Sequence, residues 1–301
     1  MKVFVTGATG VVGTRAVPAL VAAGHEVTAV ARGAAKPDLV RSMGATPVEV
    51  DLFDPSAVKD AVAGHDAVVH LATNIPPMSK AARAKAWDTN ERLRREASNL
   101  LVDAALAAGA TRYVQESICF PYLDQADRWI GEDAPVDHVG PFAGAAEAEA
   151  AAARFTAGGG IGVVLRFAQF HGEGSTHVET FNSIARKRLN PFHGAPDAYT
   201  SFVHADDAGT AVAAALTVPA GVYNVADDEP MTRVDAGAVV AAVLGVRPPK
   251  TVPAALRAAT PRSGRLLMKS LRISNQKLKD ASDWTPQHPS IRGSWWVGPR
   301  P

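Results

Sequence analysis

The chain has 301 residues, of which 47% are hydrophobic and 20% are charged, and its formal net charge at pH 7 is +1. This length suits one large domain or two small ones, and a charge near zero gives no global field that would attract nucleic acid or an anionic membrane. The single cysteine, Cys119, excludes an intrachain disulfide, and we see no signal-peptide pattern or apolar run of about 18–20 residues, so we expect a cytoplasmic protein that does not span a membrane.

Short apolar runs alternate with helical patterns through the first half of the chain. Strands are predicted, in chain order, over Lys2–Thr6, Glu26–Ala31, Pro47–Val50, Ala67–Leu71, Tyr113–Ser117 and Gly162–Phe167. Helices are predicted over Thr14–Ala23, Ser56–Ala63, Glu91–Ala108 and Ala143–Thr156. Repeated strand–helix–strand units with continuously apolar strands indicate a parallel sheet that is covered on both faces. We therefore predict an α/β fold with a doubly wound parallel sheet.

The second half of the chain has a looser rhythm, and prolines become frequent after residue 170. Residues 231–245 and 273–281 have helical patterns, while Ser201–Val203 and Gly221–Val225 could return strands to the main body. We expect residues 1–170 to form the main domain, with strands returning near 201–225, and residues 171–301 to form mainly a smaller lobe.

A glycine-rich turn, TGATGVVG at residues 6–13, follows the first strand and opens the first helix. Gly7 permits the tight turn, Gly10 lets the backbone approach a pyrophosphate, and Gly13 lets helix and strand pack closely. The helix N-terminus offers N–H groups and a partial positive charge to phosphate oxygens. A merely structural glycine turn is the alternative, but the order of strand, turn and helix favours a dinucleotide site formed by Gly7, Thr9, Gly10, Val11, Val12 and Gly13.

The end of the second strand, in HEVTAVARG, carries Arg32 where an acidic residue would bind the ribose 2′-hydroxyl of NAD. A guanidinium is suited to the 2′-phosphate of NADP, and Arg15 could assist from the first helix. A simple surface arginine is the alternative. We predict NADP(H) as the cofactor.

Several further segments resemble the extended short-chain dehydrogenase/reductase superfamily, of the NAD-dependent epimerase/dehydratase type. Asp51 and Leu52 match the acidic position that holds the adenine amino group, and HLAT at 70–73 matches the segment lining the adenine ribose. VQESI at 114–118 resembles the strand end that carries a catalytic serine. RFAQFHGEG at 166–174, SFVHADDAGTAVAAAL at 201–216 and GVYNVADDEPMT at 221–232 resemble later motifs. The resemblance implies a Rossmann dinucleotide-binding domain, a substrate-binding lobe and further cofactor contacts at Asp51, Leu52, Leu71, Ala72, Thr73, Ser117 and Phe167.

The usual proton-handling residues of that family are missing from this chain. Its members carry a Tyr-x-x-x-Lys pair, in which the lysine lowers the phenol pKa so that the tyrosine can exchange a proton with the substrate oxygen. The matching positions here are Phe142 and Ala146. Counted without gaps, the usual serine position falls on Ile118, and Ser117 lies one residue earlier.

Three residues are candidates for replacing the missing catalytic pair. Tyr122 matches the family's tyrosine near the mouth of the active site, although it could simply pack the loop. His171 follows the sixth strand at the carboxyl edge of the sheet, although a lone histidine is more often structural. Ser117 could donate a hydrogen bond to the substrate or to the nicotinamide amide. His204 is expected to order the lobe, and no cluster has metal-ligand spacing, so we predict no metal site.

Two hypotheses remain open for the function. In the first, the chain is an NADP(H)-binding, atypical short-chain dehydrogenase/reductase that reduces or isomerises a small metabolite without a Tyr–Lys pair. In the second, it is a non-redox dinucleotide-binding protein or a redox-neutral enzyme on the same fold. Either way we expect a small-molecule partner, and the helices at 91–108 and 143–156 could form the seam of a homodimer, as in the family.

Overall fold

Seven parallel strands form the central sheet of the computed structural model, which describes residues 1–77, 80–81, 83–250 and 266–298. Every pairing between neighbouring strands in this sheet is parallel. The spatial order is β11 (Gly221–Val225), β7 (Ile161–Phe167), β5 (Arg112–Ile118), β4 (Ala67–His70), β1 (Lys2–Thr6), β2 (Glu26–Val30) and β3 (Thr46–Val48). The strand order reverses its direction between β1 and β4, which is the mark of a doubly wound sheet.

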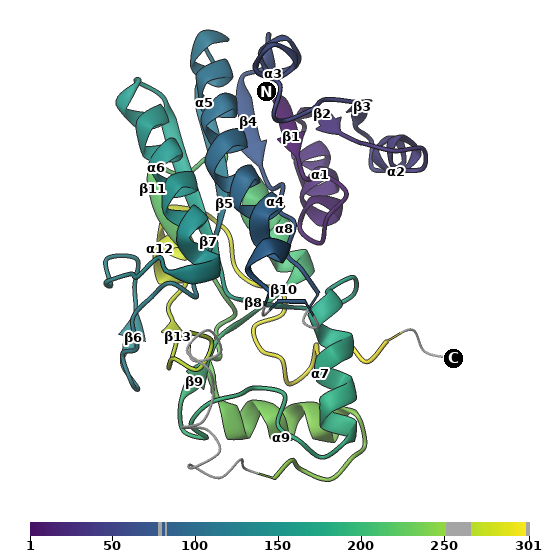
Figure 1. Ribbon diagram of the computed structural model, residues 1–301, viewed down its shortest axis with the longest axis vertical. Coiled ribbons are helices and arrows are strands. Elements are labelled where there is room, and N and C mark those ends of the chain that lie inside the picture. Colours follow the sequence, from purple (N-terminus) through teal and green to yellow (C-terminus); the bar gives the residue numbers. More distant parts are fainter. Residues whose placement is uncertain (78–79, 82, 251–265, 299–301) are drawn as a thin grey trace.

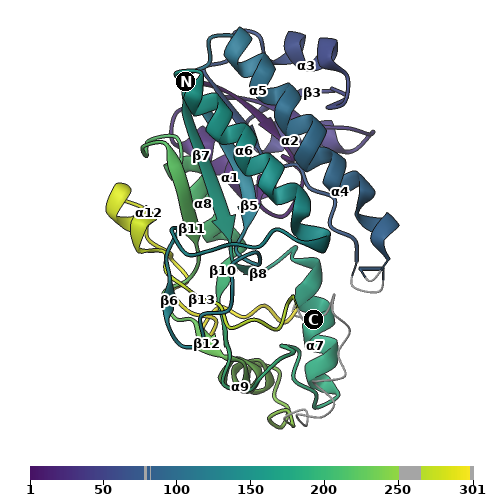
Figure 2. The same ribbon diagram turned by 60° about the vertical axis from the view of Figure 1, so that its left-hand side comes forward.

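Helices cover both faces of this sheet, as Figures 1 and 2 show. Because side chains alternate along a strand, Val3 and Val5 of β1 pack into one apolar core and Phe4 packs into the other. The first core includes side chains of α1 (Gly13–Ala22) and α8 (Ala205–Ala214). The second includes those of α3 (Pro55–Val62), α5 (Ser98–Ala107) and α6 (Ala143–Ala157). The predicted doubly wound α/β fold is confirmed.

One continuous helical stretch runs from residue 88 to residue 107, and its geometry changes in the middle. It consists of α4 (Asp88–Arg92), a π-helical turn η2 (Leu93–Ala97) and α5, and a short 3-10 helix η1 (Ala84–Trp87) precedes it. Helix α2 (Lys36–Ser42) lies between β2 and β3. The π turn carries Arg94 into the protein, where only 2% of this residue is exposed.

The remaining elements form a lobe beyond the carboxyl ends of the central strands (Figures 1 and 2). Within the described residues it includes α7 (Thr176–Arg186), α9 (Arg233–Val243) and the short 3-10 helix η3 (Gly140–Phe142) that leads into α6. Helix α12 (Gln276–Ala281) packs near β11. Short strand pairs brace the lobe: β8 (Gln169–His171) with β10 (Phe202–His204), β9 (Tyr199–Thr200) with β12 (Met231–Thr232), and β6 (Trp129–Ile130) with β13 (Arg272–Ile273). Phe181, Phe192, Phe202 and Trp295 form its aromatic core.

The chain passes between the two parts more than once. After β8, α7 and β10 it returns through α8, which packs on α1, and through β11, which pairs with β7 in the central sheet. Residues after 170 therefore contribute to both parts. The division into residues 1–170 and 171–301 stays a prediction.

Candidate functional site

The glycine turn between β1 and α1 is set by close backbone contacts. Gly7 has φ of +73°, and a Cβ built there would lie 2.4 Å from the carbonyl carbon of Leu71. A Cβ on Gly13 would lie 2.2 Å from the carbonyl oxygen of Gly7. A Cβ on Gly10 would meet only that same oxygen, at 3.3 Å. Gly7 thus allows the turn to pack against the residues that follow β4, and Gly13 allows the start of α1 to pack on the turn itself. The absence of a side chain at Gly10 leaves space above the turn for a ligand.

The N-terminus of α1 is a suitable anion site. Its N-cap residue, Val12, provides no side-chain hydrogen bond to the helix, so the first N–H groups are not capped by a side chain. These groups and the helix dipole favour a phosphate at this position. The cradle left by Gly10 and the uncapped helix start therefore fit the pyrophosphate of a dinucleotide.

The other predicted cofactor residues lie at the carboxyl ends of β1 to β4. Arg32 directly follows Ala31, is exposed, and makes no ion pair with the residues that the structure describes. Asp51 is exposed and accepts a hydrogen bond from the N–H of Phe53 at 3.0 Å, while Leu52 beside it is buried. Leu71 is buried and donates its N–H to the carbonyl of Thr6. Thr9, Val11 and Ala72 are half-buried and Thr73 is exposed, while Phe167, at the end of β7, is buried.

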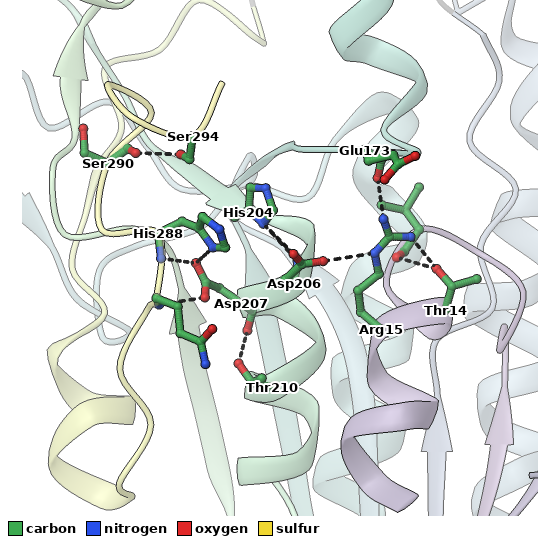
Figure 3. A network of polar contacts seen from close by, with 12 residues as sticks. Thr14, Arg15, Glu173, His204, Asp206, Asp207, Thr210, His288, Ser290 and Ser294 are labelled. Atoms are coloured by element: carbon green, nitrogen blue, oxygen red, sulfur yellow. Dashed lines mark hydrogen bonds and ion pairs between the residues drawn. The ribbon is translucent and has the colours of Figure 1, made fainter. Parts of the chain in front are cut away.

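Arg15 faces away from this nucleotide edge. Its Nε lies 3.2 Å from a carboxylate oxygen of Asp206, and its Nη2 donates to the carbonyl of Glu173 at 2.9 Å. Figure 3 shows this guanidinium reaching from α1 toward α8 and the segment after β8. Arg15 therefore contributes to the contact between the central sheet and the lobe.

An apolar cluster stands where the resemblance would place polar catalytic groups. Ile118, Phe142 and Ala145 pack together, and Phe120 and Leu266 pack against them. The rings of Phe120 and Phe142 are stacked, with their centroids 5.8 Å apart and an interplanar angle of 17°. Ala146 lies one turn further along α6 and is half-buried. None of these side chains can donate a proton.

Ser117 belongs to a buried polar network next to this cluster. Its hydroxyl donates to Glu149 on α6 at 2.6 Å, and Glu149 accepts two further hydrogen bonds from Arg166, at 2.9 and 2.6 Å. The side chains of Arg166 and Glu149 are only 7% and 12% exposed. The network thus joins the end of β5 to α6 and β7, and the Ser117 proton is directed at a carboxylate.

Tyr122 extends the same network on its other side. Its hydroxyl accepts a hydrogen bond from Arg166 at 2.8 Å and donates one to Asn224 at 2.8 Å. The residue is fully buried, and this burial raises the pKa of its phenol well above the usual range. Tyr122 and Ser117 are therefore linked through Arg166 and Glu149.

Two features of this region escaped sequence reasoning. Arg94 and Glu116 form an ion pair of 2.7 Å that is nearly fully buried, and burial raises the pKa of Glu116. His138, in the segment before η3, has a buried Nε2 with no hydrogen-bond partner among the described residues, and burial lowers the pKa of its ring. Glu149 and Arg166 are among the charged groups that face it. His138 has no motif around it, so its spacing gave no signal.

His171 lies in the aromatic core of the lobe, away from Ser117 and Tyr122. It is fully buried, its ring is stacked 5.9 Å from that of Trp295, and neither ring nitrogen has a hydrogen-bond partner among the described residues. Burial lowers its pKa to about 3, with the neighbouring rings of His204 and His288 acting in the same direction. The ring is therefore neutral at pH 7.

His204 begins α8 and anchors the contact between sheet and lobe (Figure 3). Its Nδ1 accepts the N–H of Asp206 at 3.2 Å, which caps the helix. Its ring is stacked on that of His288, with 3.7 Å between centroids, while Asp207 accepts hydrogen bonds from the N–H groups of Gln287 and His288. This network ties the C-terminal segment to α8.

Potential metal-ligating atoms of His204, Asp206 and His288 lie within 4.8 Å of one another. Because His288 lies far from His204 and Asp206 in the sequence, this group could not be found by looking for short-range metal-ligand spacing. The two imidazole planes are inclined by only 22°, so their in-plane lone pairs run nearly parallel rather than converging on one ion. Asp206 is already paired with Arg15. We therefore assign no metal to this group.

The residues from 3 to 226 match the sequence profile described as the NAD dependent epimerase/dehydratase family. The chain belongs to the NAD-dependent epimerase/dehydratase family. It is accordingly an NAD(P)-dependent oxidoreductase or an epimerase-like enzyme that uses a nicotinamide dinucleotide. Among the described residues, no helix has the length and apolarity needed to cross a bilayer.

Relatives within this family differ in how much of the chain they match. The chain is 37% identical over 309 residues to a 3-diazoavenalumate denitrifying reductase of Streptomyces sp., covering 97% of this chain and 98% of that protein. It is 35% identical over 113 residues to an L-arabinose 1-dehydrogenase (NAD(P)(+)) of Haloferax volcanii, covering 38% and 39%.

Solved structures of the family share the fold at lower identity. MoeE5 in complex with UDP-glucuronic acid and NAD superposes with a TM-score of 0.78 at 22% identity, covering 98% of this chain and 96% of that one. UDP-glucose 4-epimerase of Thermus thermophilus in complex with NAD has a TM-score of 0.74 at 24% identity, covering 95% and 94%. These similarities establish the architecture. They do not determine the reaction, for which the side chains of the apolar cluster have to be considered directly.

Proposed function

We propose that this enzyme is an NADPH-dependent reductase whose substrate accepts a hydride without taking a proton from the protein. The observation that carries the proposal is the apolar character of three positions: Ile118, Phe142 and Ala146 stand where the resemblance places a serine, a tyrosine and a lysine. Ala145 packs with Ile118 and Phe142. A carbonyl that accepts a hydride becomes an alkoxide and needs an acid. Loss of such an acid typically costs about 10²–10⁴-fold in rate.

An aryl diazonium ion is a hydride acceptor that suits an apolar site of this kind. When it gains a hydride it becomes the arene and dinitrogen, so charge and atoms balance with no proton to be moved. Its ring is apolar and planar, and Phe120 and Phe142 provide aromatic surface beside which it can lie. The full-length similarity to a protein named as a denitrifying reductase of a diazo compound supports this choice of substrate.

The nicotinamide dinucleotide would supply the hydride when bound. We assign its pyrophosphate to Gly7, Thr9, Gly10 and the N-terminus of α1 at Val11, Val12 and Gly13, and its adenosine to Asp51, Leu52, Leu71, Ala72 and Thr73. Ser117 and Phe167 are proposed to lie near the nicotinamide. Arg32, exposed and free of ion pairs within the described residues, would bind the 2′-phosphate and favour NADPH over NADH.

In this proposal, the network of Ser117, Glu149, Arg166 and Tyr122 has a structural role: it supports the apolar cluster that lines the site. It cross-links β5, β7 and α6, and Ile118 and Ala145 of the apolar cluster lie on β5 and α6. The catalytic use of Ser117, Tyr122 or His171 stays a prediction for a substrate that does need a proton. A small-molecule substrate, a cytoplasmic location and a homodimer formed through α5 and α6 complete the proposal, with no nucleic acid or membrane as partner.

The test is a substrate panel with the purified full-length enzyme and NADPH. Benzenediazonium, a ketone and an enone are compared at equal concentration, with NADPH consumption, dinitrogen release and the organic product all measured. Because diazonium ions also react without an enzyme, a protein-free sample and the Gly10→Val variant set the background. We expect benzene and dinitrogen in equal amounts from the diazonium ion, and no reduction of the ketone.

Two results would overturn the proposal. Faster reduction of the ketone or enone would show that a proton donor operates, and single replacements of Tyr122, His171 and Ser117 would identify it. Tight NADPH binding without turnover of any acceptor would favour the alternative, a redox-neutral enzyme or a dinucleotide-binding protein.

A further inference from the structure

A small cavity lies between the carboxyl ends of β5 and β7 and the lobe. Its walls include Phe120, Gln169 and Thr200, together with two cationic residues, Arg233 and Lys269. Its volume is about 30 Å³. Since one water needs roughly 10–15 Å³ measured in this way, the cavity has room for about two oxygen atoms, which is the size of a carboxylate head.

Arg233, the first of these cations, makes three hydrogen bonds to the protein backbone. Its guanidinium donates to the carbonyl oxygens of Leu267, Met268 and Lys269 at 3.0, 2.7 and 2.9 Å. Burial lowers its pKa to about 10, so it stays charged at pH 7. Arg233 therefore fixes the backbone of residues 267–269 and with it the start of the Lys269 side chain.

Lys269, the second cation, has no such partners. Its ammonium makes no hydrogen bond or ion pair with any residue that the structure describes, although the side chain is half-buried. Burial lowers its pKa, while Asp137 and Asp124 oppose this at longer range. Both carboxylate oxygens of Asp124 already accept N–H groups, from Ala126 and Ser270. This half-buried ammonium, which has no partner within the described residues, is available to an anion brought by a ligand.

The same cavity touches the apolar cluster through one side chain. Phe120 lines the cavity and is stacked on Phe142, and Leu267 and Leu271 add apolar wall. A ligand that reaches from the cluster into the cavity would thus meet aromatic surface at one end and an ammonium at the other.

We propose that Lys269 binds the carboxylate of the substrate, so that the substrate is an aromatic acid. This inference rests on the proposed function for the identity of the reacting group. Gln169 and Thr200 provide further polar atoms in the cavity wall, and Arg233 acts only by holding the segment that carries Lys269.

Binding of benzoate to the NADPH-loaded full-length enzyme tests this proposal without any turnover. Benzamide, which has the same shape and no charge, is titrated in parallel by calorimetry. We expect benzoate to bind more tightly than benzamide, and Lys269→Met to weaken benzoate by about 10- to 150-fold, the range of a hydrogen bond to a charged group. Lys269→Arg should keep most of the benzoate affinity. Lys59→Met, on the exposed side of α3, is the matched control and should change nothing.

The outcomes separate this proposal from the proposed function. Equal benzoate affinity in Lys269→Met and Lys59→Met, or benzoate and benzamide binding alike to the unaltered enzyme, would overturn the role of Lys269 even if benzenediazonium is reduced. Loss of benzoate affinity confined to Lys269→Met would support it even if no diazonium ion is turned over. Thermal unfolding of both variants confirms that they are folded.

Discussion

The glycine-rich turn at residues 6–13 and the start of α6 differ in what makes each of them specific for its proposed role. The loop depends on backbone: Gly7 and Gly13 have no room for a Cβ, and α1 offers N–H groups to an anion. The start of α6 depends on side chains: Phe142 is its N-cap residue and Ala146 lies in its first turn. A backbone site is lost when its geometry is lost, whereas a side-chain site can change its chemistry and leave the fold intact. Cofactor binding and reaction type are therefore separable in this enzyme.

Replacing Gly10 with valine should have the largest effect, a loss of cofactor binding at the glycine-rich turn. The branched side chain would occupy the surface proposed to receive the pyrophosphate, while a Cβ contact of 3.3 Å with the carbonyl oxygen of Gly7 should leave the protein able to fold. Loss of two charge-assisted hydrogen bonds of about 1.5–3 kcal/mol each would weaken NADPH binding by roughly 100-fold or more. Calorimetric titration measures it, with thermal unfolding of the cofactor-free protein as the check on folding. Undiminished NADPH binding by the folded variant would refute the assignment of the loop.

Replacing Glu149 with glutamine should destabilise the protein around the start of α6. Arg166 would lose its buried carboxylate partner, and breaking such a pair typically costs about 3–5 kcal/mol in the free energy of unfolding. Glu147 lies two residues away on α6 and is exposed, so Glu147→Gln should change stability by less than about 0.5 kcal/mol. Urea denaturation compares the two variants. Equal stability would mean that the network does not hold the wall of the site.

These two regions also differ in how far the sequence predicts them. The loop is encoded by neighbours in the chain, so its strand, glycines and helix could all be predicted. The absence of the Tyr–Lys pair, replaced by Phe142 and Ala146, could also be predicted from the sequence. The contacts of Arg166 with Tyr122 and Glu149 were not, because they join residues from separate elements, and the pairing of His204 with His288 spans most of the lobe.

Secondary structure was predictable where its pattern is strong and local. The strands of the central sheet were placed to within two residues, and β3 begins at Thr46 rather than Pro47. Helices α2 and α7 received no prediction. Helix α2 spans only 7 residues. Helix α7 buries Val178, Phe181 and Ala185 at helical spacing, so its pattern was present in the sequence and was overlooked.

Replacing Arg32 with alanine sharpens the comparison by testing a side chain within the nucleotide half. Removing the proposed charge-assisted contact to the 2′-phosphate should weaken NADPH binding by about 1.5–3 kcal/mol. NADH lacks that phosphate, so its affinity should stay the same. Calorimetry with both cofactors decides: equal NADPH and NADH affinities in the unaltered enzyme, or a loss confined to NADH in the variant, would rule out the clamp.

The buried His171 gives the lobe a pH dependence. Its pKa is about 3 in the folded protein and near 6.5 in an unfolded chain, so the unfolded state takes up a proton that the native state refuses. The stability due to the neutral ring is complete above pH 6.5 and is lost as the pH falls toward 3, by about 2 kcal/mol at pH 5. Urea denaturation of the unaltered protein and of His171→Phe at pH 7 and pH 5 measures this contribution. An unchanged difference between them at the two pH values would mean that the ring is not held neutral.

The origin of the hydrogen in the product tests the central claim most directly, namely that the apolar cluster serves a reaction in which no proton is transferred. The enzyme is run with benzenediazonium in D₂O with unlabelled NADPH, and then in H₂O with NADPH that carries deuterium at the transferable position. We predict benzene without deuterium in the first case, benzene with one deuterium in the second, and no solvent isotope effect on kcat/KM. Solvent deuterium in the product, or a rate that falls in D₂O, would show that a proton donor acts in this site and would contradict the account.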